Sequence, residues 1–133
     1  MRQGEASGWY RSDRERPHRK RRVWQSAKLL AIEMYRVTAF MPADERFGLI
    51  SQLRRAAISV PSNIAEGAGR GSGKELLRFL LIARGSLNEI DTQLEIAEEL
   101  GFVTDVDLSK LRKHYDTTSS QLQGLISRIN ARY

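Results

Sequence analysis

Apolar residues return at alternating steps of four and three along residues 76–97, and this repeat constrains the fold more than any other feature of the chain. The members are Leu76, Leu80, Ala83, Leu87, Ile90, Leu94 and Ala97. A repeat of 3.5 residues places all of them on one stripe of an α-helix. A helix with one long apolar stripe buries it against other helices at a shallow crossing angle. The repeat therefore predicts a helix packed within a bundle.

Three further segments carry the same repeat. The first runs from Val23 to Phe40, the second starts near Asp44, and the last follows residue 104. Their apolar positions are Val23, Ala27, Leu30, Met34 and Val37, then Leu49, Leu53, Ala56, Val60 and Ile64, then Leu108, Leu111, Tyr115, Thr118, Leu122, Leu125 and Ile129. No segment alternates with period two, so strands are not expected. Four helices with short connections predict an all-α, antiparallel, up-down-up-down four-helix bundle.

Local signals predict where these helices begin, end and bend. Pro42 ends the first helix, and the Ser72-Gly-Lys-Glu75 sequence is a capping box for the third. Gly101 suits the left-handed position after that helix, and Thr104 with Asp107 caps the fourth. Pro61 lacks a backbone donor, so we expect the second helix to be kinked or broken near it.

The length and composition predict one soluble domain. A chain of 133 residues builds a single core. Cysteine is absent, which excludes disulfides and thiolate metal sites. No apolar run approaches the roughly 18–20 residues that span a bilayer, so no membrane association is expected. These features predict a cytoplasmic protein.

The positive charge is concentrated at the N-terminus. Residues 1–22 contain eight arginine and lysine residues against three carboxylates, a net charge of +5 of the total +6. We therefore expect a disordered basic leader over 1–22 and the bundle domain over 23–133. Such a leader attracts RNA and other polyanions without sequence preference. The alternative is a solvated extension without a function, as a start assigned too far upstream would give.

No pattern of catalytic or metal-binding residues is present. The run Gly67–Lys74 resembles a phosphate-binding loop, but Ala68 and Glu75 occupy positions that the motif reserves for glycine and a hydroxyl residue. The two histidines, His18 and His114, are not preceded by glutamate at the spacing of di-iron bundles. No serine lies in a nucleophile elbow. We expect a protein that is not an enzyme, without a metal, a cofactor or a small-molecule substrate.

A stripe of polar residues runs beside the apolar stripe of the second and third helices. It comprises Gln52, Arg55, Ser59, Asn63, Glu66, Ser86 and Glu89. Polar groups so close to a core must be hydrogen-bonded or paired. We expect a structural network in which Arg55 pairs with Glu89 across the two helices. The alternative is an anion-binding surface for nucleic acid, lined by Arg54, Arg55, Arg70 and Lys74. Arg70 and Lys74 lie near the free N–H groups at the start of the third helix, which could hold a phosphate.

The same region carries a family resemblance. The residues are Gln52-Leu-Arg-Arg-Ala56, Ser59-Val-Pro-Ser-Asn-Ile-Ala-Glu-Gly67, Arg70, Phe79, Ile82-Ala83, Gly85-Ser86 and Glu89. They resemble the bacterial four helix bundle protein family, whose members include proteins encoded by intervening sequences of 23S rRNA genes. The resemblance runs from about Trp24 to Ile129 and leaves the leader outside.

The resemblance implies small cytosolic bundles that assemble as homo-oligomers, with pentameric rings as the family expectation. The family is also similar to the accessory protein of diversity-generating retroelements, a basic pentamer that binds reverse transcriptase and nucleic acid. Residues 23–133 carry a net charge of only +1, unlike those accessory proteins. Two hypotheses follow: an oligomeric module that binds RNA or an RNA-processing partner, and a self-assembling scaffold without a nucleic-acid role.

Apolar residues outside the core stripes independently predict association. They are Leu77, Phe79, Leu81 and Ile82. A single bundle would expose more apolar surface with them than monomers usually do. We therefore expect a stable homo-oligomer in the form of a ring.

Overall fold

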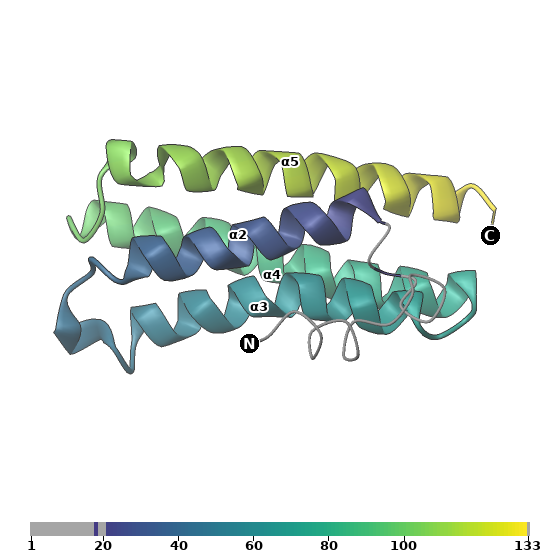
Figure 1. The fold of residues 1–133 in the computed structure, drawn as a ribbon, viewed down its shortest axis with the longest axis horizontal. Coiled ribbons are helices and arrows are strands. Elements are labelled where there is room, and N and C mark those ends of the chain that lie inside the picture. The colour runs from purple at the N-terminus through teal and green to yellow at the C-terminus, as the bar shows by residue number, and fades with distance from the viewer. Residues whose placement is uncertain (1–17, 19–20, 133) are drawn as a thin grey trace, which may run out of the picture.

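The computed structural model describes residue 18 and residues 21–132, which form four long α-helices (Figure 1). The helices are α2 (Arg22–Thr38), α3 (Leu49–Ala68), α4 (Gly73–Glu99) and α5 (Asp105–Asn130), with a short 3-10 helix, η2 (Ala43–Glu45), before α3. The described part of the chain contains no strand. The predicted four-helix, all-α fold is confirmed. The prediction of disorder for the leader falls largely on residues 1–17, outside the described residues.

Each helix packs against two neighbours, and successive helices run in opposite directions. α2 and α4 each lie against both α3 and α5 (Figure 1). Ser26, near the beginning of α2, donates to Gln121 in the second half of α5 at 2.8 Å. Arg54, near the beginning of α3, donates to Thr38 at the end of α2 at 2.8 Å. The connections are short enough to hold each helix beside the one before it.

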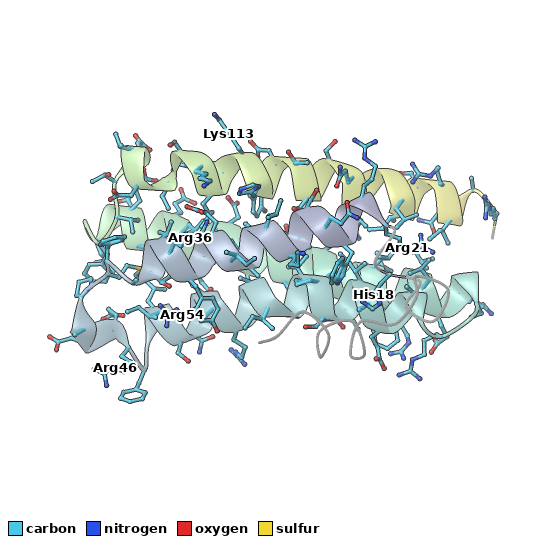
Figure 2. All side chains as sticks on the ribbon, viewed as in Figure 1. His18, Arg21, Arg36, Arg46, Arg54 and Lys113 are labelled. Carbon is cyan, nitrogen blue, oxygen red and sulfur yellow. The ribbon has the colours of Figure 1, made fainter. Side chains whose placement is uncertain are left out.

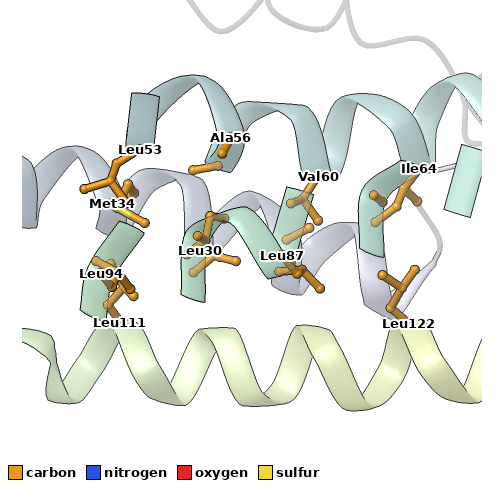
Figure 3. Packing of buried hydrophobic residues seen from close by; sticks show 14 of the residues in the cluster. Leu30, Met34, Leu53, Ala56, Val60, Ile64, Leu87, Leu94, Leu111 and Leu122 are labelled. Atoms are coloured by element: carbon orange, nitrogen blue, oxygen red, sulfur yellow. The ribbon is translucent and has the colours of Figure 1, made fainter. Parts of the chain in front are cut away.

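The core follows the predicted repeat closely. Every apolar position expected in residues 76–97 is buried, and so are all those expected in α2 (Figure 3). In α5 the stripe departs from the prediction near its end, where Ile126 is buried and Leu125 is only partly buried. The straight α-helix has 3.6 residues per turn, so a 3.5-residue stripe drifts by one position over this length.

Both predicted N-caps are present, but only the one at Thr104 is a complete capping box, because the Glu75 side chain bonds Arg78 and not the Ser72 N–H. The Ser72 hydroxyl accepts the backbone N–H of Glu75 at 3.2 Å, and the Thr104 hydroxyl accepts that of Asp107 at 3.2 Å. The Asp107 carboxylate in turn accepts the backbone N–H of Thr104 at 3.1 Å, and the two hydrogen bonds together form a capping box. Gly101 has φ +75°, the left-handed conformation expected after α4.

Two boundary predictions for the second helix are corrected. α3 begins at Leu49 and not at Asp44, because residues 43–45 form η2 instead. The Glu45 carboxylate then accepts the Leu49 N–H at 3.2 Å, so this side chain caps α3. Pro61 lies inside one uninterrupted helix, and the break expected there does not occur. A kink at Pro61 stays a prediction.

Candidate functional site

Gly67 allows α3 and α4 to approach closely at one end of the bundle. A Cβ atom at this position would lie 2.9 Å from the Phe79 Cβ and 3.2 Å from a Leu76 methyl carbon. Real Cβ atoms are not found that close to another carbon, so only glycine fits without movement of α4. The Asn-Ile-Ala-Glu-Gly67 run therefore ends at a point of helix contact.

Three residues of the predicted polar network are joined by hydrogen bonds between α3 and α4. The Asn63 amide donates to the Ser59 carbonyl at 2.8 Å and to the Ser59 hydroxyl at 2.9 Å. The Ser86 hydroxyl, on α4, donates to the Ser59 hydroxyl at 2.8 Å. Ser86 is buried, and the other two are half-buried. This part of the stripe satisfies its own polar groups and fixes the register of the two helices.

The expected ion pair between Arg55 and Glu89 does not form within the chain, and that prediction is wrong for the single protomer. Both residues are exposed. Arg55 donates instead to the Gln52 side chain, one turn earlier in α3. Glu66 likewise pairs along its own helix, with Arg70 at 2.6 Å. Four of the seven stripe residues thus face solvent, because they lie on the outer edge of the stripe.

Arg54 has structural partners. Its Nε donates to the Thr38 hydroxyl at 2.8 Å and its Nη2 to the Tyr35 carbonyl at 3.4 Å. Its guanidinium also lies 4.4 Å from the centre of the Tyr35 ring (Figure 2). These contacts place a positive charge at the negative end of the α2 dipole. Arg54 therefore ties α3 to the end of α2, a role that the anion-binding interpretation had not included.

Arg70 and Lys74 lie beside the beginning of α4, as the sequence predicted, but they differ in their contacts. Arg70 is paired with Glu66, and its guanidinium lies 5.1 Å from the centre of the Phe79 ring. Lys74 is exposed, and no ion pair involves it among the described residues. Neither side chain lines the cavity at this helix end. Their contact with nucleic acid stays a prediction.

A cavity of about 520 Å³ lies at the beginning of α4, and arginines from other elements line it. Its walls include Gly71, Ser72 and Gly73, together with Arg21, Arg128 and Arg132. A second cavity of about 280 Å³ shares Arg21 and Arg128 and adds Arg22. No carboxylate of the described residues lines either cavity. Figure 2 shows Arg21 at the beginning of α2. We call these four arginines the basic end.

The basic end was missed by the sequence analysis. Arg21 and Arg22 were assigned to the leader, although Arg22 is the first residue of α2 and Arg21 is its N-cap. Arg128 and Arg132 come from the last turn of α5 and the residues after it. Their spacing of four, at the end of an apolar repeat, was the available signal. Only the antiparallel packing shows that the α2 start meets the α5 end.

An acidic cavity of about 370 Å³ lies between α4 and α5, farther along the bundle. Its charged residues are Asp91, Glu95, Glu98, Asp116 and Arg112. Arg112 pairs with Glu98 at 2.9 Å and with Asp105 at 2.7 Å. The Arg112 guanidinium lowers the pKa of the Asp105 carboxyl, mainly through this hydrogen bond.

Tyr115 lines the same cavity. Its hydroxyl donates to the Leu87 carbonyl at 2.9 Å. Burial raises the pKa of this hydroxyl above its ordinary value, and the charges of Asp91 and Asp116 raise it further. Among the described residues, no three His, Asp or Glu side chains are arranged so that they could hold a metal ion together. None of the described helices has the length and apolar character to cross a membrane.

Comparison with known protein families identifies one match. The family described as 23S rRNA-intervening sequence protein matches residues 19–124, which is most of the chain. The chain belongs to this family. The predicted resemblance is thereby confirmed. No curated protein matches the sequence.

The family match divides the candidate residues into two groups. The polar network, Gly67, Arg70 and Lys74 all lie inside residues 19–124, and so do Arg21 and Arg22. Arg128 and Arg132 lie beyond the matched span. The match also includes the last four residues of the predicted leader, residues 19–22. The basic end thus combines residues inside the matched span with residues that follow it.

Proposed function

We propose that this chain is a non-catalytic, oligomeric bundle of the 23S rRNA intervening-sequence type that binds RNA through basic surfaces and acts in the cytoplasm. The observation that carries the proposal is the basic end. Four arginines gather around two cavities, and the described residues that line these cavities include no carboxylate. RNA is a polyanion, and clustered arginine is a common means of contacting its phosphates. The family description adds a connection to 23S rRNA genes.

The leader supports the same function. Residues 1–17 add four arginines and immediately precede the basic end in the sequence. An oligomer would present several such segments together, and multivalent presentation raises avidity beyond that of one segment. The proposed binding is therefore tolerant of sequence and strongly dependent on salt.

The test is the affinity of the full-length protein for a structured rRNA fragment, measured by fluorescence anisotropy across a series of salt concentrations. We expect the logarithm of the affinity to fall linearly with the logarithm of salt, by about 0.9 per phosphate contact. Deletion of residues 1–17 leaves α2 intact and should flatten this slope. A full-length protein that does not retain RNA at low salt would refute the RNA-binding function.

Self-association is the second part of the proposal, and exposed apolar residues support it. Leu81 and Ile82 are exposed on α4, although Leu77 is half-buried and Phe79 is buried against α3. A separate apolar groove of about 410 Å³ lies between α2 and α3, and its apolar residues include Ile32, Tyr35, Ile58 and Pro61. Two different patches on one chain suit a head-to-tail contact that closes into a ring. We propose a pentameric ring.

A scaffold without a nucleic-acid role is the alternative function. It is favoured by the Ser59–Asn63–Ser86 network and by Arg54, whose contacts are all structural. The same apolar patches would then serve assembly alone. The anisotropy measurement separates the two functions, because a scaffold assembles normally but retains no RNA.

A further inference from the structure

We propose that the cavity formed by Arg21, Arg128 and Arg132 is a phosphate-binding site for the phosphate esters of a nucleic-acid strand. The identity of the ligand rests on the proposed RNA binding, whereas the existence of an anion site rests on the arginines themselves. The cavity lies at the end of the bundle where α5 finishes and where α2 and α4 begin (Figures 1 and 2).

The first argument is that these arginines have no counter-charge. Arg36, Arg70, Arg78 and Arg112 each pair with a carboxylate. Among the described residues, Arg21, Arg128 and Arg132 form no such pair, and no carboxylate lines their cavity. The Arg21 Nε is buried and has no hydrogen-bond acceptor in the part of the chain that the structure describes. A buried donor without an acceptor is unfavourable, and an anion in the cavity would supply the acceptor.

The second argument is that the start of α2 adds to the positive potential instead of neutralising it, and that the acidic residue in the first turn of α4, Glu75, is already paired with Arg78. α2 begins with Arg22 in its first turn, contains no acidic residue there, and receives no side-chain cap from Arg21. Positive charge at a helix N-terminus opposes the helix dipole. α4 also begins at the cavity, and its Ser72 cap engages only the Glu75 N–H. The earlier N–H groups of that turn have no partner within the helix.

Arg128 lies in the last turn of α5, where a positive charge is favourable for the dipole of that helix. That effect accounts for one arginine. It does not explain why three arginines from two parts of the chain lie together beside the N-termini of two helices. Several locally unfavourable electrostatic arrangements at one place are typical of a binding site.

The shape of the site indicates how a strand would enter it. The cavity of about 520 Å³ is within the range of small-ligand sites and accommodates a phosphate with part of its nucleoside. The smaller cavity shares Arg21 and Arg128, so a second phosphate could lie beside the first. A terminal phosphate and an internal phosphodiester have the same oxygen chemistry. The experiment therefore includes both.

The test compares Arg128→Gln with Lys113→Gln in the full-length protein. Both residues are exposed on α5, and each substitution removes one positive charge, but Lys113 lines neither basic cavity (Figure 2). Binding of a fluorescent 12-nucleotide RNA is measured by anisotropy, with a phosphate or a hydroxyl at its 5′ end. We expect Arg128→Gln to weaken binding about tenfold or more and to lower the salt slope by about one. Lys113→Gln should weaken binding less than about threefold.

The two RNA ends identify the bound group. A loss that appears only with the 5′-phosphate assigns the site to a strand end, and a loss with both RNAs assigns it to internal phosphates. Equal losses for Arg128→Gln and Lys113→Gln would overturn the site, because net charge alone would then explain the binding. Circular dichroism melting curves establish that both variants are folded.

A second measurement does not require RNA. Inorganic phosphate is titrated into the full-length protein, and the arginine Nε–Hε resonances are followed by NMR, with Arg21→Lys used to assign the Arg21 signal. We expect the Arg21 signal to shift and saturate in the wild type and not in Arg128→Gln. RNA binding with no phosphate response and no Arg128 effect would overturn the site and leave the proposed function intact. A saturable phosphate response without RNA binding would support the site and refute the RNA function.

Discussion

At the scale of single residues, the distance between α3 and α4 is governed by the missing side chain of Gly67. The nearest carbon of α4 would lie 2.9 Å from a Cβ built there, which is closer than such atoms approach in proteins. Gly85, on the exposed side of α4, provides a natural comparison, because a Cβ at that position meets nothing within 4 Å. The two glycines therefore separate the effect of packing from that of backbone freedom.

We expect Gly67→Ala to lower the free energy of unfolding by about 1–3 kcal/mol, because overpacking forces α4 to move. Gly85→Ala should raise it by about 0.5–1 kcal/mol, because alanine favours the helix. Urea unfolding followed by circular dichroism measures both. Equal effects in the two variants would show that the contact at Gly67 is not tight.

Tyr115 makes stability depend on pH in the alkaline range. Its pKa is raised in the folded state, chiefly by burial, so the folded protein holds this proton more tightly than the unfolded chain. The contribution to stability is present below the ordinary tyrosine pKa of about 10. It is lost as pH rises from that value through the raised pKa, because only the unfolded chain has released its proton.

We therefore expect the wild type to lose more stability than Tyr115→Phe between about pH 9 and pH 11. At pH 7, Tyr115→Phe should cost about 1 kcal/mol for the lost bond to the Leu87 carbonyl. Urea unfolding at several pH values measures both effects, and the variant controls for the other groups that titrate in this range. The same pH dependence in both proteins would contradict the assignment to Tyr115.

Sequence reasoning located polar residues on the correct helices but could not choose their partners. Ser59, Asn63 and Ser86 were predicted as a network and are hydrogen-bonded to one another. Arg55 and Glu89 were predicted as a pair and are both exposed. Spacing fixes a residue's angle around its own helix to about 20–30°, and that is too coarse to tell a buried edge from an exposed one.

At the scale of elements, α3 shows that a packed helix can contain a proline in its interior, at Pro61. α3 continues through it, although proline removes one backbone hydrogen bond and crowds the preceding turn. Packing of α3 against both α2 and α4 compensates for this local cost. The helix was predictable from its apolar repeat, whereas its continuity at Pro61 depends on neighbours that the repeat does not specify.

We expect Pro61→Ala to raise the free energy of unfolding by about 1 kcal/mol. The gain is smaller than the roughly 3 kcal/mol by which alanine exceeds proline in helix propensity, because the unfolded chain also gains conformational freedom. Differential scanning calorimetry should show a higher midpoint. A matched Ser62→Ala substitution, at an exposed neighbour, should change stability by less than about 0.5 kcal/mol. A lower midpoint for Pro61→Ala would mean that its ring is needed for packing against α2.

The start of α3 shows a limit of element prediction. Asp44 and Glu45 were read as the first turn of the helix, yet they belong to η2, and Glu45 caps a helix that begins four residues later. Acidic residues favour both arrangements, since each places a carboxylate near free N–H groups. The apolar repeat begins at Leu49 in either case, so it identified the helix but not its first residue.

At the scale of the whole molecule, the bundle separates its charges. The arginines of the basic end surround the beginnings of α2 and α4, and the acidic cavity lies between α4 and α5 nearer the other end. Residues 23–133 are nearly neutral in total, which concealed this separation from an analysis of composition. A charge sum has no spatial information, and only the antiparallel order brings residues 21 and 128 together.

Assembly is the property of the whole molecule that the two apolar patches allow us to test. Ile82 is 43% exposed on α4, and Ile58 is 44% exposed at the groove between α2 and α3. If rings form by a head-to-tail contact of one patch with the other, Ile82→Asp and Ile58→Asp should each give a monomer of 15.2 kDa by light scattering. Val106→Asp, at an apolar residue that is 83% exposed on α5, should assemble as the wild type does.

Mixing the two monomeric variants gives the sharper result. Each retains the patch that the other has lost, so one intact contact can form between them, and further contacts cannot. We therefore expect a 1:1 heterodimer at micromolar concentration, because a head-to-tail interface uses two different surfaces. A self-complementary interface would place a damaged surface on both sides of every contact, and the mixture would stay monomeric. A monomeric wild type would contradict self-association altogether.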